Sequence, residues 1–199
     1  MSEVAIHPAA SVVLVRQAGE SASVLIGQRG AGAVFMPSKY VFPGGRVDAS
    51  DHADPSTLSM ACAARLSQCL PEFAPLPAAL LGCARRELAE ETGLHLAPAA
   101  RLRFVFRAIT PPGSPRRFDA RFFLADAAEV LGPLDDFSGA EDELSHLHWV
   151  PLTEARHLDL PFITQIVLAE LHGILDGYDQ PGVPFFDNSG AVPAFRRLV

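Results

Sequence analysis

Runs of apolar residues along the chain predict several β-strands. Two short β-branched runs, at residues 11–15 and 23–29, are joined by a polar stretch at 18–21, which indicates a hairpin. Further strand-like runs lie at residues 40–42, 103–109, 120–124 and 144–150. The chain is therefore expected to form a sheet from segments spread over most of its length.

Other segments place apolar residues three or four positions apart, which is helical periodicity. They cover residues 55–70, 78–92 and 160–175. The middle helix is followed by Gly93, a residue that readily takes the left-handed conformation found just past a helix end. Strands on both sides of a central helix, with further helices around them, predict a three-layer α/β/α sandwich. The Gly-, Pro- and Phe-rich tail from residue 177 onward is expected to be irregular, either packed on the fold or used as an oligomer contact.

Composition narrows the class of protein. The chain has 199 residues, of which 49% are hydrophobic, so one domain spanning residues 1–199 can bury a sizeable core. Its net charge is -7 with Lys39 as the single lysine, which argues against a nucleic-acid-coating surface and leaves small phosphorylated ligands as candidate partners. No apolar run approaches the roughly 18 residues that span a bilayer. Because the three cysteines lack metal-type spacing, buried free thiols in a soluble cytoplasmic protein are expected.

Three glutamates on the middle helix carry the clearest chemical signal. Glu87, Glu90 and Glu91 are separated by steps of three and four, so they project from one helix face. Their mutual repulsion disappears if cations lie between them, and oxygen ligands in this number suit Mg²⁺ or Mn²⁺. The alternative is a solvated face in which Arg86 pairs with Glu90. The turn Pro43-Gly44-Gly45 favours the metal site, since it can bring backbone carbonyls beside the same carboxylates.

The segment from Arg86 to Leu94 resembles the second half of the Nudix box, G-x5-E-x7-R-E-U-x-E-E-x-G-U with U aliphatic, at every specified position. The first half departs from that pattern. If Gly45 opens the box, Asp51 stands where the family has glutamate, and 34 residues follow where seven are expected, an insertion of 27. With the Pro-Gly-Gly neighbourhood, this interrupted box is similar to that of the coenzyme A diphosphatase branch. The inserted segment, about residues 52–77, is expected to cover the active site or to form a dimer surface.

The resemblance implies a Nudix-type fold with a central mixed sheet and assigns roles to named residues. Glu87, Glu90 and Glu91 would be metal ligands together with the carbonyl of Gly45 or Gly44, and Glu90 and Glu87 would serve catalysis. Arg86, Gly44 and Gly93 would be orienting and structural residues.

The acidic run just before residue 144 is the candidate source of a general base. Many members of the family take a further ligand or base from a later loop, and Glu143 is the first choice here, with Glu141 second. A solvated acidic loop is the alternative.

Arginines in and after a Pro/Gly-rich loop are the candidates for holding substrate. Arg116 and Arg117 lie in that loop and Arg121 follows on a strand, where guanidinium groups can contact phosphate or stack on a base. An exposed basic loop without this role is the alternative.

The resemblance therefore predicts a metal-dependent enzyme that cleaves the diphosphate linkage of a nucleoside diphosphate joined to another moiety. Coenzyme A or an acyl-coenzyme A is the alternative substrate. A non-catalytic nucleotide-sensing module is the alternative of another class, since Asp51 and the insertion depart from the box. A homodimer is compatible with either activity.

Overall fold

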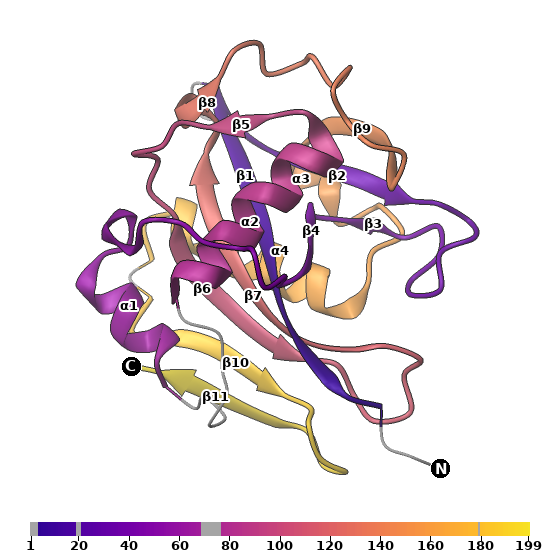
Figure 1. Cartoon of the computed structure of the whole chain (residues 1–199), viewed down its shortest axis with the longest axis vertical. Helices are drawn as coiled ribbons and strands as arrows, with labels where there is room; N and C mark the ends of the chain where they lie inside the picture. Colours follow the sequence, from indigo (N-terminus) through magenta and orange to yellow (C-terminus); the bar gives the residue numbers. More distant parts are fainter. Residues whose placement is uncertain (1–3, 19–20, 69–76, 179) are drawn as a thin grey trace.

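The computed structural model describes residues 4–18, 21–68, 77–178 and 180–199 of the chain (Figure 1). Within those residues, nine strands form one mixed sheet, in which seven strands run in the order β11-β10-β6-β7-β1-β2-β3 while β4 pairs with β1 and β9 with β2. The strands are β1 (Ile6–Ala18), β2 (Ser21–Arg29), β3 (Tyr40–Val41), β4 (Gly44–Arg46), β6 (Arg103–Ile109), β7 (Arg117–Asp126), β9 (Leu144–Pro151), β10 (Val183–Asp187) and β11 (Ala194–Leu198). The pairs β1·β7 and β10·β6 are parallel, whereas the others are antiparallel. A separate antiparallel pair joins β5 (His95–Leu96) to β8 (Val130–Leu131).

Helices cover both faces of this sheet. On one side lie α1 (Met60–Leu66) and α2 (Pro77–Thr92), and on the other lie α3 (Leu152–Ala155) and α4 (Phe162–Leu175). Figure 1 shows α2 in front of the sheet and α4 behind it. Short 3-10 turns, η1 (Pro55–Thr57) and η2 (Ala127–Glu129), complete the elements. The predicted three-layer sandwich with a central mixed sheet is confirmed.

The long strand β1 organises the sheet. It pairs with β7 along ten residues, with β4 at Ala9–Ser11 and with β2 at residues 15–18. The antiparallel pairing of β1 with β2, the next strand in the chain, confirms the predicted hairpin. One edge of β1 therefore pairs first with β4 and then with β2. This places the short strand β4 in contact with α2.

The helix predicted over residues 55–70 is shorter in the structure. The 3-10 turn at Pro55–Thr57 precedes α1, and Ser59 begins α1 by accepting a hydrogen bond from the backbone N–H of Cys62. A serine at this position satisfies a backbone donor that has no partner inside the helix, which sets a new helix start. Residues 69–76 lie outside the described part of the chain, so the end of the predicted helix falls there.

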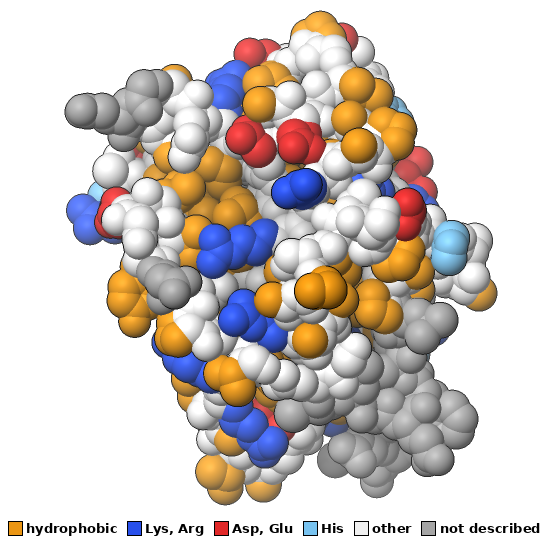
Figure 2. All heavy atoms as spheres, turned by 90° about the vertical axis from the view of Figure 1, so that its left-hand side faces the viewer, with side chains coloured by type: hydrophobic (Ala, Val, Ile, Leu, Met, Phe, Trp, Pro, Cys, Tyr) orange, Lys and Arg blue, Asp and Glu red, His pale blue; other side chains and the backbone are white. Residues whose placement is uncertain are grey.

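The prediction of an irregular C-terminal tail is wrong. Strands β10 and β11 form an antiparallel hairpin, and β10 extends the main sheet by pairing with β6 at Phe185 and Phe186. The buried side chains of Val183 and Phe185 alternate toward the core, which is the period of a strand. Figure 2 shows the side of the molecule where this edge of the sheet and α1 lie.

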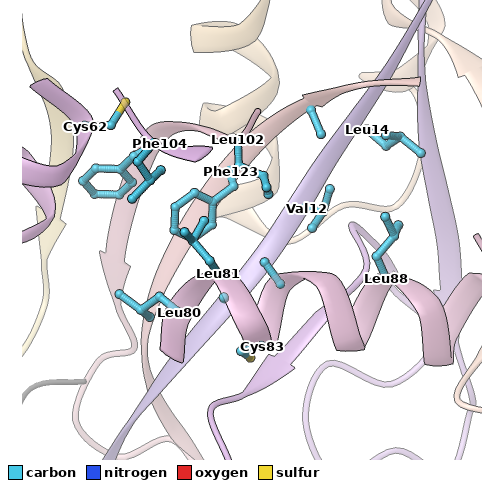
Figure 3. Close-up of a cluster of buried hydrophobic side chains, with 14 of the residues drawn as sticks. Val12, Leu14, Cys62, Leu80, Leu81, Cys83, Leu88, Leu102, Phe104 and Phe123 are labelled. Atoms are coloured by element: carbon cyan, nitrogen blue, oxygen red, sulfur yellow. The ribbon is translucent and has the colours of Figure 1, made fainter. Parts of the chain in front are cut away.

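The core between α2 and the sheet fixes the orientation of the helix. Figure 3 shows Leu81 and Leu88 of α2 pointing toward Val12 and Phe123 of the sheet. These side chains are fully or almost fully buried. Burial of one such side chain stabilises the fold by about 1.5–3 kcal/mol. The apolar stripe therefore holds α2 down, and Glu87 and Glu91 are left at the margin of the core.

No helix within the described residues is both long and apolar enough to cross a membrane.

Candidate active site

The glycine turn of β4 touches the acidic face of α2. A Cβ atom added to Gly45 would lie 2.4 Å from Oε1 of Glu87, and one added to Gly44 would lie 2.5 Å from the carbonyl oxygen of Ala10. A larger residue at Gly45 would displace the Glu87 carboxylate, and one at Gly44 would force β4 away from β1. Glycine is thus required here for close approach, and it leaves the backbone of β4 in contact with the carboxylates of α2.

The carboxylate of Glu91 is the most buried acidic group of the site. The residue is 2% exposed, and Oε2 accepts a hydrogen bond of 2.7 Å from the backbone N–H of Gly44. Its other oxygen, Oε1, is buried and has no hydrogen-bond partner among the described residues. A buried acceptor without a partner costs free energy, so this oxygen is a ready ligand for a cation.

Burial and crowding change how the carboxylates titrate. Burial raises the pKa of Glu91 to about 8, and the charges of Glu87 and Glu143 act in the same direction against the hydrogen bond from Gly44. Burial also raises the pKa of Glu87, although the neighbouring Arg86 guanidinium opposes it. Ionising all these groups together is unfavourable unless positive charge is supplied.

Arg86 supplies part of that charge. Its NH1 group donates hydrogen bonds of 2.8 Å to both Glu87 and Glu90. Its Nε and NH2 groups donate to the two oxygens of Asp51, at 2.8 and 3.0 Å, and NH2 also reaches the carbonyl of Arg46. One guanidinium therefore joins α2, β4 and the chain beyond β4.

Asp51, the residue just before the inserted segment, is the main carboxylate partner of Arg86 outside α2. Its side chain is 3% exposed, and Oδ2 also accepts a hydrogen bond from the backbone N–H of Asp48. Burial acts to raise the pKa of Asp51, but the hydrogen bonds and charge of Arg86 prevail and lower it. The aspartate at the position of the box glutamate thus stays ionised and anchors Arg86.

These oxygen donors fit a divalent cation in their chemistry. The carboxylates of Glu87 and Glu91 both lie against the backbone of β4, and Mg²⁺ and Mn²⁺ prefer such oxygens. The described residues contain no group of three or more acidic, His or Cys side chains already gathered as a metal-ligand set, and both Glu87 and Glu90 are paired with Arg86. Mg²⁺ is commonly held by one or two carboxylates, with waters and substrate phosphates as its other ligands.

The acidic loop before β9 lies beside the end of α2. Gly93 has a φ of +74°, and a Cβ added to it would lie 3.0 Å from the backbone of Gly139. This contact brings the backbone N–H of Glu141 to 2.7 Å from the carbonyl oxygen of Glu90. Gly93 therefore both ends the helix and lets the loop approach.

Of the two candidate bases, Glu143 is the one whose charge acts on the buried carboxylates. Its charge contributes to the raised pKa values of Glu87 and Glu91, and its half-exposed carboxylate accepts a hydrogen bond of 3.1 Å from Arg29. Arg29 also donates to the carbonyl of Phe35, which ties the loop after β2 to the acidic loop. The side chain of Glu141 is exposed, and its contact with the site is the hydrogen bond from its backbone N–H to the carbonyl oxygen of Glu90.

The arginines predicted to hold substrate differ in their exposure to solvent. Arg116 is exposed, as the loop interpretation requires, but Arg117 and Arg121 are each 1% exposed. Arg117 donates to the carbonyls of Thr110 and Ser189, and Arg121 donates to the carbonyl of Asp119 and pairs with its carboxylate. Neither Arg117 nor Arg121 therefore lies in an exposed basic loop, because β7 turns both side chains inward to these partners, and their role in holding substrate stays a prediction.

Two residues of the site had not been predicted as charge partners. The role of Arg29 had no signal in the sequence, since it ends an ordinary strand and meets Glu143 across 114 positions. The signal for Asp51 was its position in the box, where it looked like a departure from the pattern. The two cysteines that are described, Cys62 and Cys83, are buried free thiols as predicted, and Cys69 lies outside the described residues.

Comparison with known proteins gives the following relationships. Residues 78–171 match the family model of the NUDIX domain. A crystal structure of a NUDIX hydrolase from Alicyclobacillus acidocaldarius is similar with a TM-score of 0.61 and 27% identity, over 83% of this chain and 90% of that chain. A C. elegans Ap4A hydrolase in a binary complex has a TM-score of 0.52 and 17% identity, over 86% of this chain and 99% of that one. The NUDIX domain of Shewanella oneidensis NrtR, complexed with ADP ribose, has a TM-score of 0.54 and 15% identity, over 86% and 89%. No curated protein matches the chain.

Proposed function

We propose that this chain, whose residues 78–171 match the NUDIX domain, is a Nudix-type, metal-dependent hydrolase that cleaves the diphosphate linkage of a nucleoside diphosphate joined to another moiety. The observation that carries this proposal is the buried Oε1 of Glu91, which has no hydrogen-bond partner among the described residues and lies where β4 meets the acidic face of α2. A site that retained only its fold would gain nothing from holding this carboxylate in so costly a state.

The donors of the metal would be Glu87, Glu91 and the β4 backbone at Gly45, with Glu90 beside them. When bound, the cation neutralises the charge of the diphosphate and lowers the pKa of a coordinated water. Arg86 orients Glu87 and Glu90 by donating to both. The absence of a side chain at Gly45 lets the Glu87 carboxylate lie directly against the backbone of β4.

Glu143 is proposed as the general base, which would accept the proton of the attacking water. Its half-exposed carboxylate can reach solvent and substrate, and Arg29 holds it on the side of the buried carboxylates. A carboxylate within reach of the attacking water can act as a general base. Glu141 is the less favoured choice, because its side chain has no such contact.

The substrate class rests on the diphosphate chemistry of the site and on the relatives. The C. elegans relative is an Ap4A hydrolase, and the Shewanella relative was crystallised with ADP ribose. Both ligands contain a nucleoside joined through a phosphoanhydride. We therefore place nucleoside diphosphates with a second moiety first, and coenzyme A second.

A substrate panel with Mg²⁺ or Mn²⁺ tests the proposal. ADP-ribose, NADH, dinucleoside polyphosphates and coenzyme A would be incubated with the protein, and released nucleoside monophosphate or its counterpart would be measured. We expect cleavage of at least one compound, loss of that activity on chelation, and a strongly reduced kcat for Glu90→Gln.

A matched control is available in Glu154→Gln, which changes an exposed glutamate on α3 and should leave the rate unchanged. If Glu90→Gln retains the wild-type rate, the catalytic assignment fails. If no compound is cleaved while ADP-ribose binds tightly and unaltered, the non-catalytic sensing module becomes the better description.

A further inference from the structure

An open notch lies at the edge of the sheet, away from the carboxylates. Strand β10 pairs with β6 at Arg107 and Ala108, so the start of β6 has no strand neighbour from β10. The space beside it is a cavity of about 730 Å³ between β6, α1 and the turn η1. We call it the β6 notch. Its lining includes three arginines, two leucines and a glutamine: Arg65, Arg101, Arg103, Leu58, Leu102 and Gln180. Its volume lies in the range of small-molecule sites.

Positive charge gathers around the β6 notch. Arg65, Arg101 and Arg103 line it, and no Asp or Glu does so among the described residues. Their guanidinium groups make no hydrogen bond or ion pair with other described residues. Figure 2 looks onto this side of the molecule and shows basic side chains along its middle beside exposed hydrophobic atoms. On a chain with a net charge of -7, this is a local site for an anion.

The inner wall offers a hydrogen-bond acceptor and apolar surface. Gln180 is 3% exposed, and its Nε2 donates to the carbonyl of Val105 and to Glu170, which fixes the orientation of the amide. Its Oε1 is buried without a hydrogen-bond partner among the described residues. Leu58 and Leu102 contribute buried apolar side chains to the same wall. The notch therefore joins exposed guanidinium groups to an apolar wall, which matches an anion with an apolar body.

The β6 notch is separate from the carboxylate site. The carboxylates meet β4, which pairs with β1, whereas the notch borders β6, which is separated from β1 by β7. Three strand spacings, roughly 14 Å, therefore lie between β4 and β6. The insertion contributes η1 and α1 to the notch, so the notch exists because the box is interrupted.

We propose that the β6 notch binds a phosphorylated small molecule of nucleotide type, with its phosphates on the guanidinium groups and its base or other apolar body against the leucines. Guanidinium groups bind phosphate oxygens in two-pronged geometry and also stack on flat rings. This makes the insertion a second ligand site, and the proposal does not depend on turnover at the carboxylates.

Binding of ADP in the presence of EDTA tests this proposal, because chelation removes the cation that would hold a diphosphate against the acidic face of α2. Isothermal titration calorimetry would compare the wild type with Arg101→Gln/Arg103→Gln. We expect saturable binding by the wild type and an affinity at least tenfold weaker for the double variant. Both arginines are exposed, so the variant should keep the wild-type Tm.

The matched control is Arg156→Gln/Arg196→Gln, which removes the same charge from two exposed arginines outside the notch. It should bind ADP as the wild type does, and so should Glu91→Gln. No binding of ADP by the wild type, or equal loss in the two double variants, would overturn the proposal. So would a changed affinity in Glu91→Gln, since that would place the metal-free binding at the carboxylates.

Discussion

Replacing Asp51 by asparagine tests whether this aspartate, at the position of the box glutamate, anchors Arg86. Two carboxylate oxygens of Asp51 accept hydrogen bonds from Arg86, and one of them also accepts from the backbone of Asp48. The asparagine amide keeps the shape but loses the charge and one acceptor. Arg86 would then keep its contacts to Glu87 and Glu90 without the anchor that positions it.

The magnitude follows from burial. The Asp51 side chain is 3% exposed and that of Arg86 is 25% exposed, so solvent screens this pair weakly. Removing one partner of such a pair costs about 2–4 kcal/mol. For a chain of this size the expected fall in Tm is on the order of 10 °C. Because Asp51 has a lowered pKa, its stabilising effect is present above the usual aspartate pKa and is lost as the pH falls through the lower folded value.

Asp48→Asn is the matched control. Asp48 faces the same guanidinium, but at 3.9 Å and with 65% of its side chain exposed. Exposed pairs of this kind contribute about 0–1 kcal/mol. Urea unfolding at pH 7 would give the free energy of unfolding for both variants, and the Mg²⁺ dependence of the hydrolysis rate would be measured beside it. We expect Asp51→Asn to be destabilised and to need more Mg²⁺, and Asp48→Asn to resemble the wild type.

A double-mutant cycle with Arg86→Gln isolates the pair. The combined variant should be less destabilised than the sum of the single changes. If the single effects add, or if the two aspartate variants behave alike, Asp51 does not anchor Arg86 and the reasoning is refuted.

Three further outcomes are expected. Gly45→Ala should lower kcat on the order of a hundredfold while the protein stays folded, because its Cβ would lie 2.4 Å from Oε1 of Glu87; activity assays and circular dichroism check this, and an active variant would contradict it. In EDTA, the free energy of unfolding should fall as the pH rises from 4.5 toward 8, because folded Glu91, with its pKa of about 8, retains a proton that the unfolded chain has lost. Glu91 alone can contribute at most about 1.4 kcal/mol per pH unit to this fall. Urea unfolding of wild type and Glu91→Gln across that range should show the slope reduced in the variant, and identical slopes would exclude Glu91 as its source. Arg117→Ala should destabilise the fold by about 2–4 kcal/mol, whereas Arg116→Ala should change it by less than about 0.5 kcal/mol; equal Tm values for the two would show that burial of Arg117 carries no stabilisation.

Local pattern in the sequence determined much of the fold. The β-branched run in β1 and the apolar stripe of α2 are properties of neighbouring residues, so the strand, the helix and its end at Gly93 were predictable. The same holds for the carboxylates, because a helix places Glu87, Glu90 and Glu91 on one face whatever surrounds it. The C-terminal hairpin was not predictable in this way, since its Gly- and Pro-rich composition resembles a loop until β6 offers a partner.

The chemistry of the site depended on contacts between distant residues. Asp51 meets Arg86 across 35 positions, Arg29 meets Glu143 across 114, and Gly44 donates to Glu91 across 47. Nothing local to any of these residues encodes its partner. Likewise, the sequence put Arg117 and Arg121 in and after a basic loop, and only the contacts of β7 with distant segments such as Ser189 decided that both are buried. The sequence alone therefore determined which groups are available, whereas the tertiary structure decided which are desolvated and paired, because burial and pairing depend on contacts between distant residues.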